Sequence, residues 1–298
     1  MNRSKKLKNN KSNIVYNIVA YSSIILFSVF CLLPFWLMVA GAFTDESAII
    51  QNGYQLFPKK FSLAAFDTIF AGNRVLNSYK VTVLVTIMGT TLAMILTSMM
   101  AYGLSLKTIK YRNQISFYVV FTMLFSGGLV PWYILITQYL KLQDTIWVLF
   151  VPYLINPWYM FLLRKFFTTI PESLIESAKI DGANDFYIFV KIALPLSLPA
   201  LATIGLFYSL FFWNDWWLGL LFVNDRRLQP LQLLLRALVS NLSSEVQALN
   251  PNAKQGIIPP AYSVRMATSI ITIGPIILFY PFVQKYFVKG LTVGAVKG

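Results

Sequence analysis

The stretch PESLIESAKIDGANDFYIFVKIALP, residues 171–195, is the only long amphipathic run in the sequence, and it lies between two apolar segments long enough to cross a bilayer. Pro171 suits the first turn of a helix, because no N–H donor is needed there. Gly182 can adopt the positive φ that ends a helix, and Asn184 can cap a second one. The stretch therefore predicts two short helices around a glycine elbow, the second interrupted by Pro195.

The first of these helices is too short to be stable alone. A free helix of fewer than about 12 residues is marginal in water, because nucleation costs more than a few turns return. Leu174, Ile175 and Ala178 form an apolar stripe along it. We therefore expect it to pack either against its own membrane domain or against another protein.

Three pieces of this stretch resemble the EAA loop of ABC importer permeases: Glu176-Ser177-Ala178, Gly182 and Ile192-Ala193-Leu194-Pro195. The family loop reads Glu-Ala-Ala, a glycine after a short gap and, further on, Ile-x-Leu-Pro, so the chain departs from it only by a small-for-small change at Ser177. The resemblance implies a type I importer fold in which the loop is cytosolic and docks on a partner ATPase. The positions carried over from the family loop are Glu176, Ser177, Ala178, Asp181, Gly182 and Ala183.

Composition places the chain among membrane proteins. Of its 298 residues 57% are hydrophobic and 12% charged, against about 25% charged in soluble domains. It has no histidine, which removes the commonest general base and metal ligand, and its one cysteine, Cys31, lies in an apolar run. The net charge of +14 is spread over the ends of apolar runs rather than gathered in one stripe. That distribution is typical of membrane-protein loops and argues against a nucleic-acid partner.

Six stretches reach membrane-spanning length: 14–41, within 81–106, within 114–140, within 145–163, from 192 or 195 to about 223, and 266–284. The third contains Ser126-Gly127-Gly128 and Pro131, so we expect a broken or kinked helix there. The predicted fold class is an all-α polytopic membrane protein with six transmembrane helices and a cytosolic helix–Gly–helix coupling loop.

The predicted organisation is a cytosolic basic tail (1–13), a permease domain (14–288) containing the coupling loop (168–194), and a cytosolic C-terminal tail (289–298). The majority of the basic residues fall on the N-terminal side of the membrane, which places both termini and the coupling loop in the cytosol of a bacterial, multi-pass plasma-membrane protein. Two outer connections, 44–79 and 224–262, contain the amphipathic pieces FSLAAFDTIF and QPLQLLLRALVS. Neither is large enough for a recognition domain, so we expect a separate protein to recognise the solute.

The chain contains no visible source of energy. Asp215, within Trp213-Asn214-Asp215-Trp216-Trp217, is the one clear ionisable candidate inside a span, which disfavours ion coupling. No Gly-Lys-[Ser/Thr] sequence of a P-loop occurs either. We therefore expect a transport subunit rather than an enzyme, with no cofactor of its own and with ATP and Mg²⁺ bound by a partner ATPase.

Aromatic and amide side chains in the spans are candidates for the solute path, because aromatic faces stack on the apolar faces of sugar rings. The candidates are Trp132, Tyr133, Asn156, Trp158, Tyr208, Asn214 and Asp215. The alternative is that these aromatics form interfacial belts and packing contacts. An aromatic path suits a neutral or acidic saccharide better than a metal ion, which requires carboxylate or sulfur ligands.

Residues 152–215 and the C-terminal tail are similar to maltose-type permeases of the sugar class, and closest to the oligosaccharide subgroup of Gram-positive bacteria. The resemblance implies a saccharide substrate, a second non-identical permease subunit, two ATPase subunits and an extracytoplasmic substrate-binding protein, which is a lipoprotein in Gram-positive organisms. Membrane lipid is the remaining partner. Two alternatives stay open: an ABC permease for another solute such as a peptide, and an ion-coupled carrier or channel.

Overall fold

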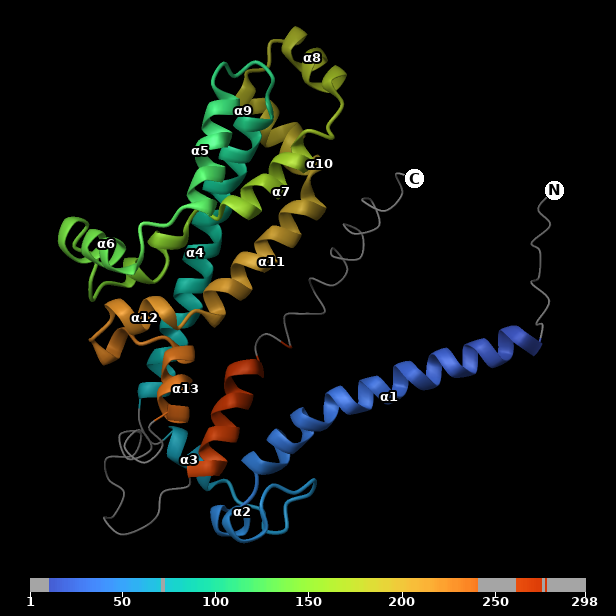
Figure 1. Ribbon diagram of the computed structural model, residues 1–298, viewed down its shortest axis with the longest axis vertical. Coiled ribbons are helices and arrows are strands. Elements are labelled where there is room, and N and C mark those ends of the chain that lie inside the picture. Colours follow the sequence, from blue (N-terminus) through green and yellow to red (C-terminus); the bar gives the residue numbers. More distant parts are fainter. Residues whose placement is uncertain (1–10, 71–72, 241–260, 275–276, 278–298) are drawn as a thin grey trace. The chain divides into compact units, whose positions relative to one another are not determined.

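The computed structural model describes residues 11–70, 73–240, 261–274 and 277 (Figure 1). Within these residues the regular elements are helices, and Thr44 and Phe61 form an isolated antiparallel bridge. The predicted all-α class is confirmed. The chain divides into two units, residues 1–71 with 246–271 and residues 72–245 with 272–298.

The first unit begins with a long apolar helix, α1 (Lys11–Ala42), which contains the whole of the first expected span. Its segment Tyr16–Ala42 is long and apolar enough to cross a membrane. Two short helices follow, α2 (Glu46–Asn52) and α3 (Ala64–Phe70), and α3 lies inside the amphipathic piece 61–70. A further helix over 261–274 begins in this unit.

Two carboxylates organise the polar connections of the first unit. Asp45 caps α2 by accepting the N–H of Ser47 at 3.1 Å, and it pairs with Lys60 at 3.2 Å. The hydrogen bond from the Ser47 side chain and then that from Lys60 hold the pKa of Asp45 below its usual value. Glu46 caps the helix over 261–274, because its carboxylate accepts the N–H groups of Tyr262 at 2.8 Å and Ser263 at 3.0 Å.

The second unit is built around α4 (Arg74–Ser105), which starts seven residues before the expected second span, 81–106. It packs against α7 (Pro157–Phe167) and α11 (Leu198–Asn214). The approach is close at Gly89, where a Cβ atom would lie 3.0 Å from the Cβ of Phe150 and 3.0 Å from the ring of Phe212. Glycine is therefore required at this position because there is no room for a side chain, and not because of its backbone angles.

The third expected span is broken, as predicted. It consists of α5 (Arg112–Leu124) followed, after a bend of 112°, by α6 (Leu129–Ile134) and the π-helical η1 (Leu135–Tyr139). Gly128 precedes α6 with a φ of 86°, a backbone conformation that glycine adopts without a steric penalty.

The fourth expected span, 145–163, is also broken, which the sequence did not indicate. Two 3₁₀ turns, η2 (Ile146–Leu149) and η3 (Val151–Tyr153), are followed by α7 at an angle of 52°. The break has a local cause. Asn156 has extended backbone angles, and its side chain caps α7 by accepting the N–H groups of Trp158 at 3.0 Å and Tyr159 at 3.3 Å.

The fifth expected span differs at both ends. A helical run of α9 (Asp185–Ile188), π-helical η4 (Phe189–Ala193) and α10 (Leu194–Leu196) meets α11 at 84°. The bend falls at Ser197, so Pro195 sits inside a helical turn instead of interrupting it. At the other end α11 stops at Asn214, and α12 (Trp217–Phe222) continues separately.

The remaining elements are α8 (Glu172–Ile180), described below, η5 (Arg226–Leu228) and α13 (Leu231–Ser240), which lies in the expected helical piece 229–240. Among the described residues, two single helices and three bent pairs are long and apolar enough to span a membrane. Residues 275–276 and 278–284 of the sixth expected span, 266–284, lie outside the described residues, as do the start of the N-terminal tail and the tail 289–298.

Candidate coupling surface and solute path

The glycine elbow predicted from the sequence is present. α8 ends in a Schellman arrangement, in which the N–H of Ala183 bonds to the carbonyl of Ala178 at 2.9 Å and the N–H of Gly182 to that of Lys179 at 3.0 Å. Gly182 has a φ of +83°. The Asn184 side chain then caps α9 by accepting the N–H of Tyr187 at 2.8 Å. These bonds satisfy two carbonyls at the end of α8 and an N–H in the first turn of α9.

α8 lies on the surface of its unit and contains no buried residue. Of the six predicted coupling residues, Glu176, Ser177, Asp181 and Gly182 are exposed, while Ala178 and Ala183 are half-buried. Ile175 is also half-buried and packs on the core with both alanines, so the predicted apolar stripe faces the unit only in part. Sequence reasoning did not single out Ile180, whose side chain is 86% exposed.

Two ion pairs flank the exposed helix. The ammonium of Lys107 lies 2.6 Å from the carboxylate of Glu172, and that of Lys179 lies 2.9 Å from that of Asp185. All four side chains are substantially exposed, and such pairs contribute roughly 0–1 kcal/mol each. The ion pairs therefore orient α8 only weakly.

The segment after the elbow is anchored firmly. Ile188 and Phe189 are buried, and the ring of Phe189 lies 5.1 Å from that of Tyr102 on α4 and 6.4 Å from that of Phe167 on α7. The elbow thus joins an exposed arm, α8, to a buried arm that is part of the core. In Figure 1 α8 lies at one end of the second unit, and α12 and α13 lie at the other.

The predicted path residues fall into two groups. Trp132 and Tyr133 of α6 both pack on Phe222 of α12, with ring centroids 5.2 Å and 5.3 Å away. Asn214 ends α11, and the carboxylate of Asp215 accepts the N–H of Leu218 at 3.2 Å. These four residues therefore share the α6–α12 end of the second unit.

The other three predicted path residues lie elsewhere. Tyr208 is 1% exposed, and its hydroxyl accepts the N–H of Asn156 at 2.9 Å and contacts the hydroxyl of Thr97 at 2.7 Å. Both Asn156 and Tyr208 are therefore engaged in holding the break before α7. Trp158 is 60% exposed on α7.

A pocket of about 480 Å³ opens at the break of the third span. Its lining combines the Gly-containing link with aromatic rings: Ser126, Gly127, Gly128, Leu129, Pro131, Trp132, Leu135, Tyr153 and Trp217. Trp132 was predicted, whereas Tyr153 and Trp217 were missed. Trp217 could have been found from the sequence, because it belongs to the segment Trp213-Asn214-Asp215-Trp216-Trp217. Nothing in the sequence indicated that Tyr153 would stack on Trp132, with the ring centroids 6.2 Å apart.

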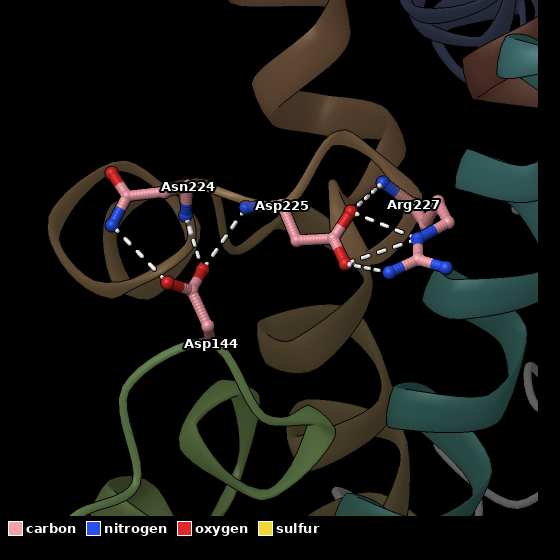
Figure 2. A network of polar contacts seen from close by, with 4 residues as sticks. All are labelled: Asp144, Asn224, Asp225 and Arg227. Atoms are coloured by element: carbon pink, nitrogen blue, oxygen red, sulfur yellow. Dashed lines mark hydrogen bonds and ion pairs between the residues drawn. The ribbon is translucent and has the colours of Figure 1, made fainter.

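Close to this end, Asp144 holds the segment that follows α12 (Figure 2). Its carboxylate accepts the backbone N–H groups of Asn224 and Asp225 and, at 3.2 Å, the side-chain amide of Asn224. Asp225 in turn pairs with Arg227 at 2.9 Å. The backbone hydrogen bonds from Asp225 and Asn224 lower the pKa of Asp144, because they stabilise its charged form.

The part of the chain that the structure describes contains no group of three or more His, Cys, Asp or Glu side chains able to hold a metal ion. The two regions described above are thus a surface elbow and an aromatic pocket at opposite ends of one unit.

The chain belongs to the family described as binding-protein-dependent transport system inner membrane component, whose model matches residues 93–293. It is thus an integral membrane protein of the ABC importer permease class. As such it is a transport subunit rather than an enzyme, and the ATPase activity belongs to a partner.

Two curated relatives and one solved structure match this chain over nearly their whole length. The chain is 42% identical to the polygalacturonan/rhamnogalacturonan transport system permease protein YtcP of Bacillus subtilis (strain 168), over 96% of this chain and 99% of that one. It is 27% identical to the arabinooligosaccharides transport system permease protein AraQ of the same organism, over 95% and 97%. A crystal structure of a bacterial ABC transporter involved in the import of the acidic polysaccharide alginate matches with a TM-score of 0.82 at 28% identity, covering 95% of this chain and 100% of that one.

Proposed function

We propose that the chain forms half of the translocation path for an oligosaccharide in an ATP-driven importer. Saccharide transport is named for YtcP, for AraQ and for the alginate importer. The pocket between α6, η3 and α12 supports the same substrate class, since it presents two tryptophans and a tyrosine to a ligand. Rings of this kind offer large flat apolar faces with a polar edge, which suits the mixed surface of a sugar.

One observation supports the coupling mechanism: α8 is exposed, whereas the segment that follows Gly182 is buried in the core. α8 has no buried residue, yet Gly182 joins it to Phe189 and Ile188 in the core. A short helix with an exposed isoleucine, Ile180, gains stability when a partner covers it. The ATPase would cover α8, with Glu176 offering its carboxylate and Ser177 and Ala178 allowing close approach.

The assembly would contain a second non-identical permease, two ATPase subunits and an extracytoplasmic binding protein. Both termini and α8 would face the cytosol, with the α12–α13 end outside. The chain itself would hold no cofactor, because ATP and Mg²⁺ would bind to the ATPase subunits. Closure of the ATPase dimer would displace α8 and tilt the spans that the buried arm joins.

Gly182→Val tests this role, with Gly53→Val as its matched control. Both glycines have positive φ, +83° and +69°, and a Cβ atom added to either would have no heavy atom within 4 Å, so both substitutions strain the backbone without a clash. Such strain costs about 1–3 kcal/mol. We expect Gly182→Val to reduce ATPase copurification and ATP-dependent uptake about tenfold, and Gly53→Val to leave copurification unchanged.

Undiminished ATPase association and transport in Gly182→Val would reject the coupling role of the elbow. Uptake assays with oligosaccharides and with peptides, delivered by the cognate binding protein, test the substrate class. Transport of a peptide with no saccharide uptake would contradict the saccharide path. Uptake by the chain alone, driven by an ion gradient without ATP, would contradict the ATP-driven mechanism as a whole.

A further inference from the structure

Four aromatic side chains at the α6–α12 end of the second unit form two pairs that meet at the pocket and are here called the aromatic row: Tyr153 with Trp132, and Trp217 with Trp216. Trp132 and Tyr153 are stacked, with an interplanar angle of 21°, and both line the pocket of about 480 Å³ together with Trp217. Trp217 is 37% exposed, and its ring centroid lies 5.4 Å from that of Trp216. The aromatic row therefore leads from the pocket to Trp216.

A guanidinium group stands at the Trp216 end of the row. The Cζ atom of Arg236, on α13, lies 3.6 Å from the centroid of the Trp216 ring. The arginine side chain is exposed. Stacking uses the face of a guanidinium, whereas all of its N–H donors lie in its plane, so a stacked arginine keeps the geometry that matches a carboxylate.

One amide side chain, that of Gln232, lies one helical turn from this arginine and holds a second amide, that of Asn214. Gln232 precedes Arg236 by four residues on α13, which places both on one face of the helix. The Gln232 amide donates to the side-chain oxygen of Asn214 at 3.1 Å, and the Asn214 amide donates to the carbonyl of Leu210 at 2.8 Å. The end of the aromatic row thus combines a cation with groups that pair with hydroxyls.

We infer that the aromatic row binds an acidic oligosaccharide and that Arg236 recognises the carboxylate of a uronic acid residue in it. This inference rests on the proposed saccharide function. Aromatic faces cover the C–H faces of sugar rings whatever their charge, so the row alone accepts neutral and acidic chains. A guanidinium pairs with a carboxylate through two parallel charge-assisted hydrogen bonds, and a neutral sugar has no group that does so.

Asp215 adds a direction to the binding mode. Asp215 immediately precedes Trp216 in the sequence. Its carboxylate accepts the N–H of Leu218 in the first turn of α12. A substrate carboxylate placed beside it is repelled, whereas one placed over Arg236 is attracted. The acidic sugar is therefore held at the α13 end of the row, and the rings that follow it extend toward the pocket.

The test uses the assembled importer in nanodiscs of zwitterionic lipid, without the binding protein, so that only the membrane subunits select the ligand. The probes are a trisaccharide with a single galacturonic acid residue, at one end, and the same trisaccharide with that carboxylate methyl-esterified, titrated by tryptophan fluorescence. We expect the acid to bind about tenfold more tightly than the ester, which is the range of one charge-assisted pair. Arg236→Gln should bring the acid to the affinity of the ester and leave the ester within about twofold, while Arg236→Lys should restore part of the preference.

Arg226→Gln is the matched control, because Arg226 is also an exposed arginine in the same connection after α12. It should keep the preference for the acid. Equal loss in Arg226→Gln would mean that overall positive charge attracts the acid, and would overturn the inference. A preference for the acid over the ester that persists in Arg236→Gln would overturn the inference as well. The inference would also be overturned if Arg236→Gln changed only the response of the importer to added anionic lipid.

If Arg236→Gln fails to assemble, the wild-type comparison of acid and ester decides, and equal binding of the two overturns the inference. The outcomes also separate this inference from the proposed function. Transport of a neutral oligosaccharide without any preference for the acid removes only the uronate recognition. Transport of neither trisaccharide and of no other saccharide removes the proposed function itself.

Discussion

The carboxylate of Asp144 accepts both the backbone N–H and, at 3.2 Å, the side-chain amide of Asn224, across a sequence separation of 80 residues. It joins the turn before η2 to the segment that leaves α12 (Figure 2). The backbone N–H of Asp144 completes the link by donating to the carbonyl of Phe222 at 3.0 Å. The start of the fourth expected span and the end of the fifth, both broken, are thereby fixed to each other through one exposed side chain.

This link predicts an acid-sensitive contribution to stability. Hydrogen bonds from Asp225 and Asn224 lower the pKa of Asp144 below its usual value of 3.8. The contribution is therefore fully present above 3.8 and is lost as pH falls through the lower, folded-state pKa. We expect Asp144→Asn to lower the free energy of unfolding by about 1 kcal/mol or less at pH 7, since the group is exposed.

Thermal unfolding of the purified complex between pH 3 and 7 measures the effect. The difference between wild type and Asp144→Asn should shrink toward the acid end of this range. Asp67→Asn, at an exposed aspartate of α3, is the control. A difference that stays constant over the whole range would show that the charge of Asp144 does not stabilise the link.

Gly89→Ala should destabilise the contact between α4 and α11. The added Cβ would lie 3.0 Å from atoms of Phe150 and Phe212, both buried, so neighbours must move. Overpacking of this kind costs about 1–3 kcal/mol. Gly205→Ala is the matched control, because its Cβ would meet only the sulfur of Met94 at 3.9 Å. Thermal unfolding should show a loss for the first variant and none for the second; equal stability would contradict the close approach.

Tyr208→Phe should weaken the break before α7. It removes the hydroxyl that pairs with the N–H of Asn156 and the hydroxyl of Thr97, and leaves these buried or half-buried groups without that partner. The cost is about 1–3 kcal/mol in the free energy of unfolding. Tyr139→Phe, at a tyrosine that is 77% exposed, should have no effect. Similar unfolding curves for both variants would argue that the Tyr208 hydroxyl contributes nothing.

Glu46→Ala should expose the first turn of the helix over 261–274 to exchange with solvent. The carboxylate of Glu46 accepts the N–H groups of Tyr262 and Ser263, which lie in the first turn of this helix. A lost cap of about 1.4 kcal/mol corresponds to about tenfold faster hydrogen exchange at these two amides. Mass spectrometry measures the exchange, with Glu172→Ala as the control. Unchanged protection at both amides would contradict the capping role.

Local chemistry allowed several features to be predicted from the sequence. The elbow at Gly182 was predictable because glycine supplies positive φ and Asn184 is a favoured cap. The break of the third span was predictable from Gly127, Gly128 and Pro131. In each case the residues that determine the backbone are neighbours in the sequence.

The features that were missed depend on distant residues. The break at Asn156 needs the hydroxyl of Tyr208, 52 residues away, as the partner of its N–H. The sequence could not distinguish a Tyr208 buried in the core from a Tyr208 that lines the solute path, because an aromatic residue in an apolar span suits both roles. The stacking of Arg236 on Trp216 joins α13 to the segment before α12, and periodicity within either piece carries no information about it.

The glycine contact at residue 89 has a mechanical consequence. At Gly89 the backbone of α4 lies so close to the rings of Phe150 and Phe212 that α4 and α11 cannot slide past each other there without a collision. If a partner ATPase displaces α8 as proposed, α4 and α11 would therefore move together rather than shift against each other. The pocket at the opposite end of the unit would consequently change its orientation together with the elbow.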